Sequence, residues 1–169
     1  MILFKDFHIN PILRGEKTQT RRIWKKPRAK VGSVHLAKTQ MLSTYYFAKL
    51  LITGIRKEKL CQITPEDAMK EGGYSVEEFV DIWNQINGKW SPDLEVTVID
   101  FELAYSGIKK GDLVVLSNEC AEHSIHGDIR WDVTEDPWWI PGNEMVRIQS
   151  GSSKIYSSFA TKFLEKVEA

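Results

Sequence analysis

Thr64-Pro65-Glu66-Asp67, Ser75-Val76-Glu77-Glu78 and the run from Glu95 to Leu103 decide the fold, because they predict two helices followed by a strand. In the first stretch the threonine is typical of a helix N-cap and the proline of a first helical position. In the second, a serine and a glutamate three residues apart form a capping box. That second helix is expected to end at Asn87-Gly88.

Strand signals lie on both sides of the two helices. Aromatic and β-branched residues over 45–56 predict a long strand with a bulge at Gly54, and shorter strands are expected at 1–5, 18–24 and 31–37. This order of several strands, two helices and further strands differs from alternating βαβ units. The sequence therefore predicts an α+β fold, an open β-barrel with two short helices between its strands.

The sequence signals for helices and strands are weaker from residue 104 onward. A turn and a strand are expected at 111–116, residues 117–144 are aromatic and irregular, and apolar residues four apart predict a terminal helix over 155–167. We expect one domain over residues 1–103, and a C-terminal extension over 104–169 that packs on the same barrel.

The net charge of zero conceals a strong asymmetry along the 169 residues. Residues 1–60 carry a net charge of +11, residues 61–103 carry −8 and residues 104–169 carry −3. A basic first third in a neutral protein favours a site for a polyanion such as nucleic acid. The alternative is a solvated basic face that the acidic middle neutralises after folding.

Cysteine usage and hydropathy favour a cytoplasmic protein without a membrane partner. Two cysteines far apart make no disulfide framework, the first residues lack the apolar core of a signal peptide, and no apolar run is long enough for a membrane span. Cys120, His123 and His126, with Asp128 and two glutamates nearby, are not spaced as a standard zinc site. We interpret them as an irregular polar loop and expect neither a metal nor a cofactor.

The stretch Gly15-Glu16-Lys17-Thr18-Gln19-Thr20-Arg21-Arg22 resembles the glycine-x-lysine-threonine-x-threonine-arginine signature of ASCH domains, which are small barrels related to the PUA RNA-binding fold. Further matches follow in the right order over about residues 2–103, and the chain is most similar to the archaeal type of member. They comprise Lys26-Pro27-Arg28 to Gly32, Ile63 to Gly72, Glu78-Phe79 with Trp83, Ile86-Asn87-Gly88, and the strand Val96 to Phe101. The resemblance implies a PUA-like open barrel with the signature in its cleft.

The resemblance also implies a function. ASCH domains are similar to RNA-binding proteins, and some small bacterial members are amidohydrolases that remove the acetyl group from acetylcytidine. Their catalytic lysine, threonine and glutamate correspond to Lys17, Thr20 and Glu71. Amide hydrolysis needs a nucleophile, a base and an oxyanion stabiliser, and Thr20, a desolvated Lys17 and a nearby arginine suit these roles.

Non-catalytic roles remain open for the same three residues. Lys17 and Thr20 would face opposite sides of an extended strand, so they converge only if the chain bends near Lys17-Thr18. Otherwise Lys17 is a solvated lysine that binds phosphate, Thr20 is an ordinary strand residue, and Glu71 is a surface acid at a helix end.

The remaining candidates are basic and aromatic. Arginine forks match phosphate groups, and the ring of Trp24 either stacks on a base or packs in the core. The tryptophans Trp131, Trp138 and Trp139 either line a groove for a protein partner or pack the extension. The nucleic-acid-binding candidates are Arg14, Lys17, Arg21, Arg22, Trp24, Lys25, Lys26, Arg28 and Lys30.

The leading hypothesis is that the chain binds RNA or a nucleotide through the positive cleft of residues 14–30. The first alternative is an amidohydrolase that acts on acylated pyrimidine nucleosides such as N4-acetylcytidine. A ribonuclease that stabilises a pentavalent phosphate with its lysines and arginines is a further alternative. The last is a protein-interaction adaptor that uses the aromatic C-terminal segment.

Overall fold

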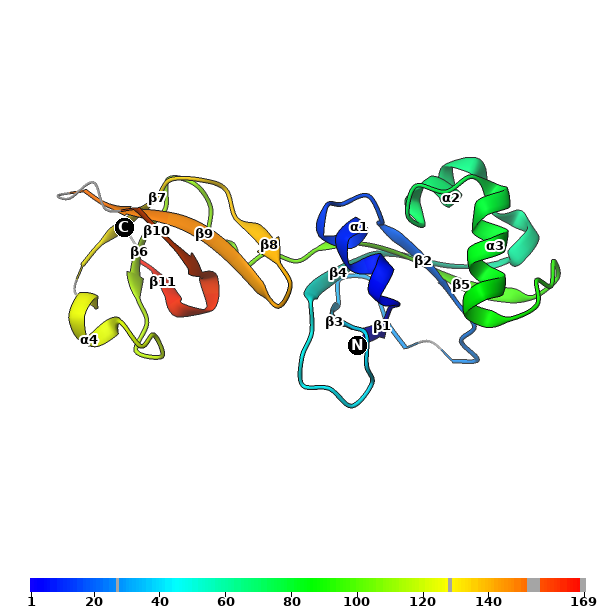
Figure 1. The fold of residues 1–169 in the computed structure, drawn as a ribbon, viewed down its shortest axis with the longest axis horizontal. Helices are drawn as coiled ribbons and strands as arrows, with labels where there is room; N and C mark the ends of the chain where they lie inside the picture. Colours follow the sequence, from blue (N-terminus) through cyan, green and yellow to red (C-terminus); the bar gives the residue numbers. More distant parts are fainter. Residues whose placement is uncertain (27, 128, 152–155, 168–169) are drawn as a thin grey trace. The chain divides into compact units, whose positions relative to one another are not determined.

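The computed structural model describes residues 1–26, 28–127, 129–151 and 156–167, so the expectations for Pro27, Asp128 and Ile155 lie outside the described residues. The chain divides into two compact units, Met1–Ala104 and Tyr105–Ala169 (Figure 1). This boundary falls one residue after the expected one. Among the described residues, no helix has the length and apolar character needed to cross a membrane.

The first unit is built on a five-stranded sheet that curls into a half-barrel. The first strand pairs in parallel with the third, and the other neighbours are antiparallel. The α+β prediction is confirmed, and so is the bulge, because the register between β4 and β5 shifts beside Gly54. The order across the sheet is β1 (Ile2–Leu3), β3 (Val34–Lys38), β4 (Ala48–Lys59), β5 (Glu95–Leu103) and β2 (Gln19–Arg22).

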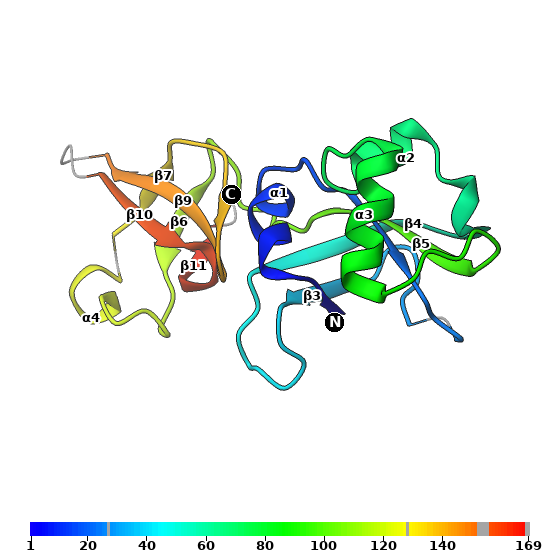
Figure 2. The same cartoon turned by 45° about the vertical axis from the view of Figure 1, so that its right-hand side comes forward.

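The two predicted helices lie between β4 and β5, as α2 (Pro65–Lys70) and α3 (Val76–Asn87). Thr64 accepts a hydrogen bond from the backbone of the third helical residue at 3.1 Å, and Ser75 begins the expected capping box. Helix α3 lies along one face of the sheet (Figures 1 and 2). Its Phe79 and Trp83 pack with Val96 and Val98 of β5 in one apolar core.

The segment before β2 forms a short 3-10 helix, η1 (Asp6–His8), and α1 (Ile9–Leu13). Phe4, just before them, makes edge-on contacts with Phe47 and Phe101, with ring centroids 6.1 and 5.9 Å apart. These three buried rings tie the N-terminal segment to the inner side of the sheet. A further 3-10 helix, η2 (Leu60–Gln62), links β4 to α2.

The second unit is a sheet with its own apolar core, which includes Trp131, Val146 and Ile148. The predicted terminal helix over 155–167 is wrong, because the described residues there form two strands that pair with β9 and β6, with a short 3-10 helix between them. Tertiary strand pairing outweighs the four-residue apolar spacing. Residues 117–144 also contain short strands rather than an irregular chain. The elements are β6 (Leu113–Leu116), α4 (His123–His126), β7 (Trp131–Val133), β8 (Trp138–Ile140), β9 (Asn143–Ser150), β10 (Tyr156–Ala160), η3 (Thr161–Phe163) and β11 (Leu164–Lys166).

Candidate functional site

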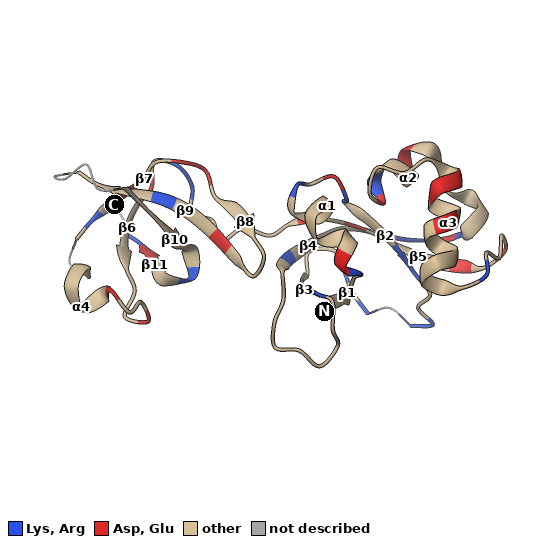
Figure 3. Cartoon of the chain, in the orientation of Figure 1, with Lys and Arg blue, Asp and Glu red and all other residues tan. Residues whose placement is uncertain are grey.

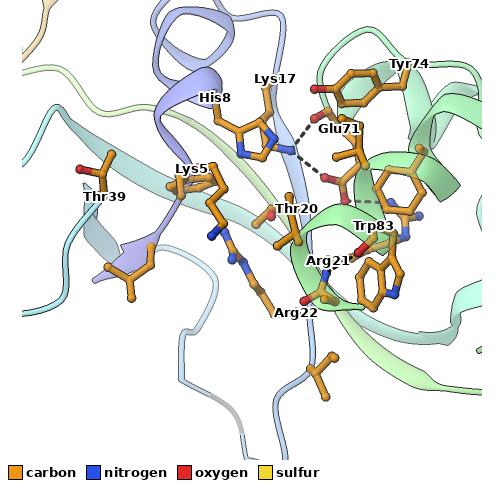
Figure 4. Close-up of a pocket in the computed structure, with 17 residues that line it drawn as sticks. Lys5, His8, Lys17, Thr20, Arg21, Arg22, Thr39, Glu71, Tyr74 and Trp83 are labelled. Atoms are coloured by element: carbon orange, nitrogen blue, oxygen red, sulfur yellow. Dashed lines mark hydrogen bonds and ion pairs between the residues drawn. The ribbon is translucent and has the colours of Figure 1, made fainter. Parts of the chain in front are cut away.

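A cavity of about 240 Å³ lies within the first unit, lined by β1, η1, β2, the end of α2 and one face of α3 (Figure 4). Lys17, Thr20 and Glu71 all line it, and each is less than 5% exposed. Lys5, Ile23 and Asn87 line it too, and these exposed residues mark its mouth. The cavity therefore runs from solvent to a polar interior.

The chain before β2 explains how Lys17 reaches the same cavity as Thr20. Gly15 adopts a positive φ of 72°, which glycine tolerates best, after the turn of α1. The backbone N–H groups of Glu16 and Lys17 both donate to the carbonyl of Pro11, at 2.8 and 3.0 Å. Lys17 thus precedes the strand, and the expected bend brings it to the side that Thr20 faces.

Glu71 meets Lys17 deep in the cavity. Lys17 Nζ donates to Glu71 Oε2 at 2.7 Å and to the Glu71 carbonyl oxygen at 2.5 Å. The backbone of Thr18 also donates to the carbonyl of Lys70 at 2.9 Å, which ties the signature loop to α2. Glu71 caps the C-terminus of α2 and is 4% exposed, so the alternatives of a surface acid and a solvated lysine are wrong.

Burial lowers the pKa of Lys17, and the cationic neighbours Arg22 and Arg21 lower it further, while Glu71 partly opposes the shift. Burial therefore makes the neutral amine, the form that acts as a base, more accessible than in an exposed lysine. A neutral amine carries two N–H groups and one lone pair. Because Glu71 supplies two acceptors, the lone pair of the neutral amine is left for a third group.

The guanidinium of Arg21 is bound by other side chains of the protein. Its guanidinium donates to Glu58 through Nε at 3.0 Å and Nη2 at 2.7 Å, and through Nη1 to Gln19 at 2.7 Å and Glu71 at 3.1 Å. Nη2 also lies 3.0 Å from Asp67 Oδ2. Four hydrogen bonds and one further ion-pair contact thus surround a guanidinium that has five N–H donors, which leaves it little capacity for a ligand. The structure thus gives Arg21 the role of holding Glu71 in place.

Arg22, the next residue, is placed differently. Its guanidinium carbon lies 4.9 Å from the centre of the Phe4 ring, a cation–π contact. Its Nε is buried and has no hydrogen-bond partner, and among the described residues no carboxylate forms an ion pair with it. Burial lowers its pKa, with Glu71 acting in the opposite direction.

His8 is a site residue that the sequence did not reveal. It lines the cavity, is 6% exposed, and its Nδ1 is buried without a hydrogen-bond partner. Burial, followed by the charges of Lys17 and Arg22, lowers its pKa to about 3, so the ring is neutral at physiological pH. A buried polar atom without a partner costs about 1–3 kcal/mol, a penalty that a bound ligand would relieve.

The other basic candidates lie outside the cavity lining. Basic residues mark β2 and the segment that follows it (Figure 3), and most of that segment is exposed. Arg14 pairs with Glu16 at 2.9 Å on the surface, and Trp24 is half-buried. The exposed residues that line no cavity are Arg14, Lys25, Lys26, Arg28 and Lys30.

The C-terminal candidates are largely internal. Trp131 belongs to the core of the second unit and Trp139 is buried, while Trp138 is half-buried. These positions favour the packing alternative over a groove. Within the described parts of the chain, no three His, Cys, Asp or Glu side chains are arranged to hold a metal ion.

Comparisons with known proteins find similarity at the level of structure. No family model matches the chain, and no curated protein matches it at a significant level. Among the solved structures that the chain resembles are ASCH domains. One from Lactobacillus crispatus JV V101 has 17% sequence identity and a TM-score of 0.44, over 58% of this chain and 70% of that one.

Two further structures are similar to a comparable degree. A protein of the family DUF984 from Enterococcus faecalis V583 has 17% identity and a TM-score of 0.47, over 60% of this chain and 74% of that one. A mutant of ZmASCH from Zymomonas mobilis has 13% identity and a TM-score of 0.43, over 60% of this chain and 66% of that one. At this level of similarity, residue roles have to come from the contacts of this chain itself.

Proposed function

We propose that the first unit is an ASCH domain of the PUA-like type that binds an N-acylated pyrimidine nucleoside and hydrolyses its amide. This proposal rests on the observation that Lys17, Thr20 and Glu71 line one cavity, in which Lys17 is buried and its pKa is lowered. Pockets for drug-sized ligands occupy roughly 300–1,000 Å³. The smaller volume of about 240 Å³ suits a nucleoside-sized group better than a folded RNA.

The hydrogen bonds around Lys17 support a division of roles. Both N–H groups of its neutral amine are donated to Glu71, so the lone pair is left to accept the proton of the Thr20 hydroxyl. The Thr20 oxygen attacks the acyl carbon, the amide C–N bond breaks, and the Lys17 ammonium returns the proton to the leaving amine. Water then hydrolyses the threonine ester and regenerates the hydroxyl.

The test is the release of cytidine from N4-acetylcytidine by the full-length protein and its Thr20 variants. We expect turnover by the wild type, loss of at least about a hundredfold in Thr20→Val, and partial activity in Thr20→Ser, which keeps the nucleophile. Circular dichroism checks that each variant is folded. No turnover by the wild type, or full activity in Thr20→Val, would refute the proposal.

RNA binding is the second candidate, and it is favoured by the exposed cations that surround the half-buried Trp24. Four of them, Lys25, Lys26, Arg28 and Lys30, face solvent without lining the cavity. Phosphate contacts release counterions, so the affinity for single-stranded RNA should fall steeply with salt. Changing these four residues to Gln should weaken binding and flatten the salt dependence while cytidine release continues. An unchanged affinity would exclude this surface.

The setting that we propose is the cytoplasm. Cys61 and Cys120 are both free thiols, which suits a reducing compartment.

A protein partner of the C-terminal unit stays a proposal as well. The exposed Ile140 lies beside the tryptophans of β8 and is a residue through which such a partner would bind.

A further inference from the structure

We infer that Arg22, with His8 and Lys5, forms an anion subsite in this cavity, so that the preferred ligand is a nucleoside monophosphate rather than a neutral nucleoside. This inference rests on the proposed function, because it concerns the substrate of the same cavity. It assigns a role to two groups, Arg22 and His8, that the proposed hydrolysis leaves unused.

The contrast between two neighbouring arginines carries the inference. The Arg21 guanidinium makes four hydrogen bonds to Gln19, Glu58 and Glu71 and an ion pair with Asp67. Arg22 lines the same cavity, yet its buried Nε has no partner, and within the described part of the chain no acidic side chain pairs with it. A guanidinium matches the oxygens of a phosphate with parallel N–H donors. Arg22 is therefore the arginine whose donors are available to a ligand.

His8 provides a second, independent observation. Its ring lines the cavity, is more than nine-tenths buried, and has an Nδ1 without a partner. In the tautomer that carries a hydrogen on Nδ1, the neutral ring donates to an anionic oxygen without adding a buried charge. Because the charge of Arg22 acts on His8, the ring lies beside a cation that an anion would neutralise.

The gradient of burial fixes where the phosphate would sit. Lys17 and Thr20 are at most 4% exposed, Arg22 is half-buried, and Lys5 is exposed at the mouth. Lys5 and Arg22 both line the cavity (Figure 4). A ligand with its acyl group at Lys17 and Thr20 would thus extend its phosphate toward the mouth, where the anion keeps part of its hydration.

The experiment compares kcat/KM for N4-acetylcytidine with that for its 5′-monophosphate, using the full-length protein at low ionic strength. We expect the wild type to prefer the monophosphate by at least about tenfold, and Arg22→Gln to bring the ratio of the two values close to one. Arg130→Gln is the control, since this exposed arginine lies in the second unit. It should keep the wild-type ratio.

A second variant and a binding measurement keep the test decisive if Arg22→Gln does not fold. Lys5→Gln should lower the preference by about threefold, and calorimetry on the wild type should show cytidine 5′-monophosphate binding at least about tenfold tighter than cytidine. Equal turnover of both substrates would overturn the subsite alone. Turnover of neither would overturn the proposed function with it. A preference for an oligonucleotide that carries acetylcytidine over the monophosphate would overturn the assignment to a free nucleotide.

Discussion

Replacing Arg21 with methionine tests whether this arginine is a structural group. Methionine keeps an unbranched side chain of similar length but removes every donor that now meets Glu58, Asp67 and Glu71. The side chain of Arg21 is 1% exposed, and removing one partner of a buried ion pair costs about 3–5 kcal/mol. The loss has an upper bound because each of these carboxylates keeps another nitrogen donor. Arg56 remains with Glu58 and Asp67, and Lys17 remains with Glu71.

The assay is hydrogen exchange of the β5 backbone amides in the full-length chain, which reports the opening free energy of the first unit separately from the second. We expect Arg21→Met to lower that free energy by about 3–5 kcal/mol. The matched control is Arg14→Met, whose ion pair with Glu16 lies on the surface at 2.9 Å and should contribute less than about 1 kcal/mol. If the Arg21 and Arg14 variants lose equally little, the buried network does not stabilise the fold as argued.

Two further changes test other parts of the account. The pKa of His8 is about 3 in the folded chain against 6.5 unfolded, so only the unfolded chain takes up a proton as pH falls through 6.5. Stability is then lost toward pH 3, and between pH 7 and pH 5 the wild type should lose about 2 kcal/mol more than His8→Gln in urea unfolding. Equal losses would contradict the shift. For Gly54→Ala, the added Cβ would lie 2.7 Å from Asp100 Oδ2, whose carboxylate also accepts from Gln19 at 2.7 Å. We expect a destabilisation of about 1–2 kcal/mol by thermal unfolding, and an unchanged midpoint would show that Asp100 moves freely.

Local rules predicted much of the first unit. The N-caps at Thr64 and Ser75 and the bulge at Gly54 each depend on a few neighbouring residues, and the structure confirms them. The strand from Glu95 to Leu103 was also predicted at its observed bounds. The second unit was harder, because the strands that replace the predicted helix over 155–167 form by pairing with distant strands.

Some of the cavity residues were also predictable from the sequence, while the roles of others depend on contacts with residues distant in the chain. The resemblance to ASCH domains pointed to Lys17, Thr20 and Glu71, which the structure places together. The engagement of Arg21 depends on carboxylates 37, 46 and 50 residues away in the chain, which local patterns do not reveal. No sequence signal distinguished His8 either, since its role depends on the burial of one ring among cations from β2 and the loop before it.

The pH profile of cytidine release from N4-acetylcytidine tests the central claim most directly. If a buried Lys17 of lowered pKa is the base, kcat/KM in the wild type should rise with pH along a limb well below the ordinary titration range of lysine. The folded Lys17→Met variant should show no release at any pH. Release that persists in Lys17→Met, or a wild-type limb at the ordinary lysine pKa, would contradict the account.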